Sequence, residues 1–293
     1  MEVNQLTTVY EETLDRQAPH SYYPRPSLER DSFISLNGEW DFSLSKSKNC
    51  AEYNEKILVP FPPESRLSGI ERTVSKAEYM HYRRRFTLHR GFINERVILH
   101  FGAVDQECEV YLNDKHIGEN YGGYLPFSFD ITDALTEGEN TLYVRARDAL
   151  DKKYPYGKQK KNRGGMWYTP VSGIWQSVWL ESVAEKHIEE LRVTPTLNEV
   201  KITVVGGEDE KILTLETGEE YSFTGNEITV APENPINWSP ENPHLYRFTL
   251  KSGEDTVKSY FALREIGISA FNEVNALTLN GRKYLFNGLL DQG

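Results

Sequence analysis

Cysteine is scarce in this sequence, with only Cys50 and Cys108 among 293 residues. Two cysteines are too few for a disulfide framework at this length, which excludes the small disulfide-stapled class of secreted domains. Cys108 also alternates with Val110 and Leu112, so the pattern predicts a buried, reduced thiol. This cysteine usage is compatible with a cytoplasmic protein.

Long apolar runs and an excess of basic charge are also missing. No stretch of about 18 apolar residues occurs, and the amino end MEVNQLTTVYEET has no basic segment before an apolar run, so we expect no membrane span and no signal peptide. Lys and Arg number 33 against 44 Asp and Glu, a net charge of −11 that repels phosphate backbones and anionic lipid heads. We therefore expect neither nucleic acid nor membrane as a partner, and a cytoplasmic location.

Motifs for metals and nucleotide cofactors are absent too. The seven histidines form no HxxxH or HExxH spacing, and the two cysteines form no CxxC pair, so no metal site is predicted. The glycine pairs at 122–123 and 164–165 lack the GxGxxG and GK[ST] patterns of phosphate-binding loops. We expect no cofactor.

What the sequence does contain is alternation with a period of two residues. Apolar and polar residues alternate at 40–44, 82–88 and 142–146, which predicts half-buried strands. Turn signals such as Asn37-Gly38 and Asn113-Asp114 lie between such segments, and no segment sustains a helical apolar stripe. The pattern predicts an all-β protein built from antiparallel sandwiches.

A charge at Arg84 interrupts one of these alternating segments. The alternation places Arg84 on the same side as Tyr82 and Phe86, and a buried charge needs a partner. We therefore predict that Arg84 forms an ion pair inside the sandwich.

A change of composition near residues 183–186 divides the chain, because shorter and more acidic strands follow an aromatic-rich first part. We expect a first domain over residues 1–184 and an immunoglobulin-like β-sandwich over 185–268. A predicted hairpin with an Asn280-Gly281 turn opens a third unit over 269–293, which we expect to stop within a strand.

Several sequence blocks follow one another in a specific order: RPSLERDSFISLNGEWDFSL at 25–44, VPFPPES at 59–65, HYRRRFTL at 81–88, FGAVDQECEVYLNDKHIGENYGGYLPFSFDIT at 101–132, GGMWYTPVSGIWQSVWLE at 164–181, WSPENPHLY at 238–246 and YFALREIGI at 260–268. In this order the blocks resemble the amino-terminal half of the family 2 glycoside hydrolases, the family of bacterial β-galactosidases, β-glucuronidases and β-mannosidases. The resemblance implies a jelly-roll sugar-binding-type β-sandwich, then an immunoglobulin-like β-sandwich, and then the start of a truncated (β/α)8 barrel.

The resemblance also implies a retaining mechanism, with an acid/base Glu in an Asn-Glu pair and a nucleophile Glu, both on barrel strands. Retention needs two carboxyl groups about 5 to 5.5 Å apart. Asn-Glu pairs occur at 54–55, 94–95, 198–199, 226–227 and 272–273. All five lie at predicted turns or strand ends, where Asn favours tight turns. We therefore assign no catalytic residue and expect no turnover from this chain alone.

Substrate contacts are the remaining candidates for site residues. By resemblance, Asp105 in GAVD matches a family position whose Asn or Asp side chain reaches toward the substrate, while capping of a local turn is the alternative interpretation. Trp167 and Tyr168 offer flat faces for the C–H faces of a sugar, or alternatively pack against the barrel. Asp291 falls near the carboxyl end of the first barrel strand, where barrel enzymes place functional residues.

The identity of the sugar stays open at this point. Gly164-Gly165 stand where some family members carry an acidic residue, and Leu290-Asp291-Gln292-Gly293 differs from the Asn and His-Glu-His cluster of the best-known β-galactosidases. A parent enzyme for β-galactosides is the main hypothesis, with β-glucuronides or β-mannosides as alternatives. Two other functions remain open, a stand-alone carbohydrate-binding protein and a module for homo-oligomer contacts.

Overall fold

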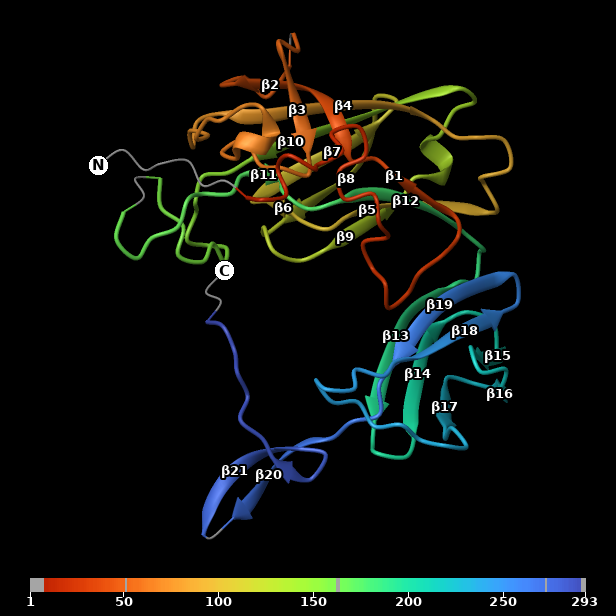
Figure 1. Ribbon diagram of the computed structural model, residues 1–293. Coiled ribbons are helices and arrows are strands. Elements are labelled where there is room, and N and C mark those ends of the chain that lie inside the picture. Colours follow the sequence, from red (N-terminus) through yellow and green to blue (C-terminus); the bar gives the residue numbers. More distant parts are fainter. Residues whose placement is uncertain (1–7, 51, 162–163, 272, 291–293) are drawn as a thin grey trace. The chain divides into compact units, whose positions relative to one another are not determined.

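A computed structural model describes residues 8–50, 52–161, 164–271 and 273–290, and these residues form mainly β-strands (Figure 1). The backbone contacts divide the chain into two compact units. The first contains the residues up to Pro24 together with Ser32–Ser182, and the second contains Arg25–Asp31 together with the described chain from Val183 onward. The prediction of an all-β protein is confirmed. Within these ranges no helix is long and apolar enough to cross a bilayer.

The first unit is a β-sandwich. Its strands are β1 (Phe33–Ser35), β2 (Gly38–Ser45), β3 (Glu55–Val59), β4 (Tyr79–Thr87), β5 (Arg96–Phe101), β6 (Val104–Asp105), β7 (Glu107–Leu112), β8 (Lys115–Tyr121), β9 (Phe127–Asp130), β10 (Glu139–Arg147), β11 (Gly173–Ile174) and β12 (Val178–Val183), with 3-10 turns at Arg66–Ser68 and Thr132–Ala134. One sheet has the order β1-β12-β5-β9 and the other the order β3-β2-β4-β10-β7-β8, and Figure 1 shows them as two layers. The short pair β11-β6 carries Asp105.

One apolar core lies between the two sheets of the first unit. Trp40, Phe42 and Tyr82 are buried in it, with ring centroids 6.4 Å apart for Trp40 and Tyr82 and 4.9 Å apart for Phe42 and Tyr82. Cys108 is a buried free thiol of this core, as predicted from its alternation, and burial raises its pKa to about 12. The alternating strands are therefore stable because every second side chain points into the apolar core.

The predicted ion pair of Arg84 is wrong. Its guanidinium donates to the backbone carbonyl oxygen of Glu39, and it has no carboxylate partner in the part of the chain that the structure describes. The neighbouring Arg83, on the opposite face of the sheet, makes the ion pair instead, at 2.7 Å from Asp41. Arg84 is only half-buried, so its charge keeps some contact with water, although its Nε is buried and has no hydrogen-bond partner among the described residues.

The second unit is a smaller β-sandwich with its own core. Its strands are β13 (Ile188–Pro195), β14 (Val200–Gly206), β15 (Glu210–Leu215), β16 (Glu220–Thr224), β17 (Glu227–Val230), β18 (Tyr246–Ser252) and β19 (Asp255–Phe261). They form one sheet with the order β13-β14-β17 and another with the order β16-β15-β18-β19. Ile202, Leu213 and Phe248 lie in the core between these sheets.

A three-stranded sheet follows, made of β20 (Ile266–Phe271), β21 (Val274–Leu279) and β22 (Arg282–Lys283). β21 and β22 pair across Asn280-Gly281, whose φ angles of 53° and 74° belong to the left-handed region that a type I′ turn requires. The predicted hairpin is confirmed.

The segment Arg25–Asp31 completes the second unit. Glu29 exchanges two backbone hydrogen bonds with Lys258 of β19, at 2.9 and 2.8 Å, so the segment covers the free edge of that strand. Arg30 donates to both carboxylate oxygens of Asp255 at 2.9 Å, and Asp255 also accepts the N–H of Ile188 at 2.8 Å. Each partner of this ion pair is only 4% exposed. The buried charges are therefore paired and hydrogen-bonded.

We expect Arg30→Met to destabilise the second unit by about 3–5 kcal/mol, because the Asp255 carboxylate stays buried without its cation. Urea denaturation followed by circular dichroism measures the loss. Arg192→Met is the matched control, since it removes an exposed ion pair with Glu190 in the same unit and should leave the stability nearly unchanged. Equal losses in the two variants would contradict a dominant role for the buried pair.

Candidate functional site

Asp105 lies at the end of β6 and pairs with Gly173 of β11. The residue is 1% exposed. Gln159 Nε2 donates to Asp105 Oδ2 at 3.4 Å, whereas Oδ1 is buried and has no hydrogen-bond partner among the described residues. The side chain makes no bond to neighbouring backbone there, so the structure gives no support to the turn-capping interpretation. An unsatisfied buried oxygen is costly, which marks Asp105 as a site candidate.

Two further carboxyl groups, those of Glu64 and Asp148, belong to the same polar cluster. The Ser172 hydroxyl lies 2.8 Å from Glu64 Oε1 and 2.9 Å from Asp148 Oδ2. The backbone N–H of Ser172 donates to Glu64 Oε2 at 3.2 Å, and that of Leu150 donates to Asp148 Oδ1 at 2.7 Å. These bonds hold Glu64 and Asp148 in place. The third carboxyl group, that of Asp105, uses only one of its two oxygens for a hydrogen bond within the described chain.

Burial raises the pKa of all three carboxyl groups, and for Asp105 repulsion from the other two adds to it. The pKa of Asp105 rises to about 7, first because of burial and then because of the charge on Asp148, with Glu64 adding a smaller effect and the Gln159 hydrogen bond opposing it. Burial is also the main cause of the raised pKa of Glu64 and of Asp148, and the bonds from Ser172 act against it. Asp105 therefore exchanges its proton near neutral pH, and its acid form can donate a hydrogen bond.

Gly123 packs directly against the Asp105 carboxyl group. A Cβ atom at position 123 would lie 2.4 Å from Asp105 Cγ, so only glycine permits this approach. The indole N–H of Trp175 donates to the Gly123 carbonyl at 2.8 Å and holds the loop in place. The close packing fixes the orientation of the carboxyl group.

Gln159 connects Asp105 to the loop that carries Trp167 and Tyr168. Its amide also donates to the Tyr124 hydroxyl at 3.0 Å, and its backbone forms a bridge with Tyr168. Trp167 is 38% exposed and Tyr168 41% exposed. The loop is thus joined to Asp105 through Gln159, while no hydrogen bond between Asp105 and either ring occurs within the described ranges.

One predicted site residue cannot be placed, and three residues of the cluster were not predicted. Asp291 lies outside the described residues. Glu64, Asp148 and Gln159 were not predicted, although Glu64 lies in the VPFPPES block and Asp148 directly follows an alternating strand. In the part of the chain that the structure covers, no three His, Cys, Asp or Glu side chains are grouped so that they could hold a metal ion. The arrangement suits hydrogen bonding to a polar ligand.

Two family models match the chain in succession. Residues 59–180 match the model described as "Glycosyl hydrolase 2 galactose-binding domain-like", and residues 181–264 match "Glycosyl hydrolases family 2". Among curated relatives, a β-galactosidase of Thermoanaerobacter pseudethanolicus is 26% identical over 71% of this chain and 31% of its own length. A β-galactosidase of Kluyveromyces lactis is 27% identical over 88% of this chain and 28% of its own length. A putative β-glucuronidase of Formosa agariphila is 26% identical over 67% of this chain and 26% of its own length. The chain therefore spans about a third or less of these relatives.

Solved structures share the fold. A β-glucuronidase of Lactobacillus rhamnosus matches with a TM-score of 0.70 and 23% identity, over 86% of this chain and 47% of that one. A β-glucuronidase of Faecalibacterium prausnitzii matches with a TM-score of 0.69 and 23% identity, over 91% of this chain and 51% of that one. At this identity the likeness concerns the fold alone.

We expect Asp105→Asn to weaken the pH dependence of stability. The folded chain holds the Asp105 proton up to a pKa of about 7, whereas the unfolded chain releases it near 3.8, so this contribution to stability is full below the unfolded pKa and is lost as the pH rises through 7. Between about pH 5 and pH 8 the free energy of unfolding of the variant should therefore rise by about 1–3 kcal/mol relative to that of the natural protein. Urea denaturation at both pH values measures the gain. Parallel pH profiles would show that Asp105 holds no proton near neutrality.

We expect Gly123→Ala to destabilise the first unit by about 1–3 kcal/mol, because the added methyl group meets the Asp105 carboxyl group. Gly164→Ala is the control, since a Cβ atom there meets no described atom within 4 Å apart from those of the adjacent residues. Thermal unfolding of the two variants gives the comparison. A loss of the same size in the control would argue against tight packing at Asp105.

Proposed function

The chain belongs to glycosyl hydrolase family 2, and we propose that it forms the non-catalytic amino-terminal part of a β-galactosidase-like retaining glycoside hydrolase. The observation that carries this proposal is the succession of the two family domains over residues 59–264. In this proposal residues 1–184 form a jelly-roll sugar-binding-type domain and 185–268 an immunoglobulin-like sandwich. Residues 269–293 then lead into a catalytic (β/α)8 barrel.

The Asp105 cluster serves as one wall of the sugar pocket in this proposal. Asp105 has an unpaired buried oxygen and a pKa of about 7, so it can accept a hydrogen bond from a sugar hydroxyl or donate one to it. Such a bond is strong because little water competes for it. Gln159, on the loop that also carries Trp167 and Tyr168, donates to the carboxyl group, so its side chain has to move before a sugar bonds to that oxygen. Trp167 and Tyr168 on this loop then offer their rings to the C–H faces of the sugar.

The acid/base and nucleophile glutamates belong to the barrel rather than to these two sandwiches. Retaining hydrolysis needs one protonated and one ionised carboxyl group about 5 to 5.5 Å apart, on either side of the scissile bond. Glu64 and Asp148 are tied to Ser172, and burial raises the pKa of both. Neither is a good nucleophile candidate, because a nucleophile has to be ionised and within reach of the sugar.

Exposed apolar side chains on β20 and β21 support a contact with a further domain. On one face of this sheet Ile266 is 61% exposed and Ile268 69%, and Leu277, which is paired with Ile268, is 49% exposed. A cluster of exposed apolar side chains marks an interaction surface. In the proposed parent enzyme this surface packs against the barrel, and Asp291 supplies a further substrate contact there.

The sugar could be a β-galactoside or a β-glucuronide, because curated relatives carry both names. A β-mannoside, a stand-alone carbohydrate-binding role and homo-oligomer contacts stay alternatives. The cytoplasmic location and the lack of nucleic-acid or membrane partners stay predictions from composition.

We expect the 293-residue chain to release no nitrophenol from nitrophenyl β-galactoside, β-glucuronide or β-mannoside, because no catalytic pair is assigned to its sandwiches. Absorbance after prolonged incubation measures release, and a complete family 2 β-galactosidase serves as the positive control. Release that Asp105→Asn abolishes would contradict the proposal. Sugar binding that depends on Asp105 in the chain alone would instead favour the stand-alone carbohydrate-binding role.

A further inference from the structure

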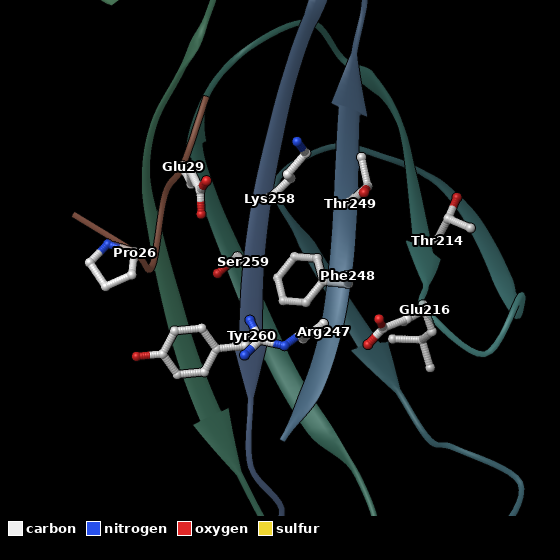
Figure 2. A pocket seen from close by; sticks show the side chains of 11 residues that line it. Pro26, Glu29, Thr214, Glu216, Arg247, Phe248, Thr249, Lys258, Ser259 and Tyr260 are labelled. Atoms are coloured by element: carbon white, nitrogen blue, oxygen red, sulfur yellow. The ribbon is translucent and has the colours of Figure 1, made fainter. Parts of the chain in front are cut away.

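A hollow of about 300 Å³ lies on the β16-β15-β18-β19 sheet of the second unit (Figure 2). Along β18 the side chains of Tyr246, Phe248 and Leu250 are buried, so Arg247 and Thr249 point to the opposite, outer face. The hollow opens on this outer face. Its volume is at the lower end of the roughly 300–1,000 Å³ of small-molecule pockets.

The strand register arranges the polar side chains of the hollow in two rows. Arg247 is paired with Tyr260, and Glu216 follows in the same row because its N–H donates to the Arg247 carbonyl at 2.9 Å. In the second row Thr249 stands between Thr214 and Lys258. Directly opposed residues in a sheet have Cβ atoms about 4.5–5.5 Å apart, so each row can contact one small ligand.

The segment Arg25–Asp31 forms a further wall of the hollow. Figure 2 shows Pro26 and Glu29 on one side of Tyr260 and Lys258, with Thr214 and Glu216 on the other side. The backbone pairing of Glu29 with Lys258 fixes this wall, and so does the bond from the Ser259 hydroxyl to the Ser27 carbonyl at 2.7 Å. The hollow is therefore formed before any ligand arrives, which reduces the cost of binding.

Free hydrogen-bonding groups line the hollow. Throughout the described chain, neither the Arg247 guanidinium nor the Glu216 carboxylate has a side-chain hydrogen bond or ion pair of its own. Lys258 is already paired with Asp31, which leaves the basic Arg247 beside the acidic Glu29 and Glu216. These groups disfavour an anionic ligand and suit a neutral one with several donors and acceptors.

We propose that this hollow is a non-catalytic binding site for a neutral pyranose sugar. The Tyr260 ring packs on the C–H face of the sugar, while Arg247 donates to one hydroxyl and Glu216 accepts from its neighbour. Bonds to ionised groups are the stronger kind, which favours vicinal hydroxyls as ligands. The site goes beyond the proposed function, because it needs neither a catalytic barrel nor Asp105.

Calorimetric titration of the whole chain with lactose tests the proposal. We expect saturable binding with a dissociation constant on the order of 1 mM, weakened about tenfold or more by Tyr260→Ala and by Arg247→Ala. Arg247→Lys should also weaken binding, since an ammonium group lacks the planar fork. Lys251→Ala is the matched control, because this exposed cation lies on the same face of β18 but does not line the hollow.

Asp105→Asn separates the two sites, and it should leave lactose binding at the hollow unchanged. The proposal is overturned if the natural chain gives no saturable heat at about tenfold higher lactose, or if Tyr260→Ala and Arg247→Ala bind as well as Lys251→Ala. It is also overturned if Asp105→Asn alone abolishes binding, a result that would move the sugar to the first unit. Circular dichroism of each variant checks that the second unit is folded, and the exposed position of Arg247 favours folding of its variants.

Discussion

The buried ion pair between Arg30 and Asp255 is the constraint on which the second unit depends. Its partners are 225 residues apart in the sequence, and the same Asp255 carboxylate accepts a backbone N–H from Ile188 at the start of β13. One carboxylate therefore joins the edge strand of one sheet, the first strand of the other and a segment from near the amino end. Because all these bonds are buried, the loss of one partner leaves the others unsatisfied. The chain has to contribute to the second unit twice, before and after the strands of the first.

The carboxyl cluster of Asp105, Glu64 and Asp148 differs from this ion pair, because it brings together groups of like charge. Three carboxyl groups with raised pKa values occupy one buried region, an arrangement that disfavours their charged forms rather than stabilising the fold. Ser172 offsets part of the cost for Glu64 and Asp148, while Asp105 keeps a bare oxygen. Strongly perturbed carboxyl groups tend to gather at functional sites, since folding alone gives no reason to retain them. The sequence resemblance and the electrostatics thus both support the proposal of Asp105 as a site residue.

The sequence was a good guide wherever local chemistry decides the structure. Alternation predicted the strands and the buried Cys108, and Asn280-Gly281 predicted the hairpin, because side-chain period and positive φ are properties of a few neighbouring residues. Alternation could not predict the partner of Arg84. The direction of a side chain follows from its neighbours in the sequence, whereas its partner comes from a distant segment. Glu64, Asp148 and Gln159 escaped prediction for the same reason, as they come from three separate segments. Asp105 was found only through the family resemblance.

The pairing of residues 25–31 with β19 is the long-range contact that the sequence indicates least. Nothing in that segment's composition indicates that Glu29 bonds to Lys258, because a strand edge accepts almost any backbone with free N–H and C=O groups. Specificity comes instead from charged side chains, since in this register Arg30 meets Asp255 and Asp31 meets Lys258. The same register places Pro26 and Glu29 beside Tyr260 and Lys258, so the wall of the hollow is a consequence of how the edge is covered. A ligand that binds there contacts the edge-covering segment and the sheet at once, and it should therefore stabilise their pairing by mass action.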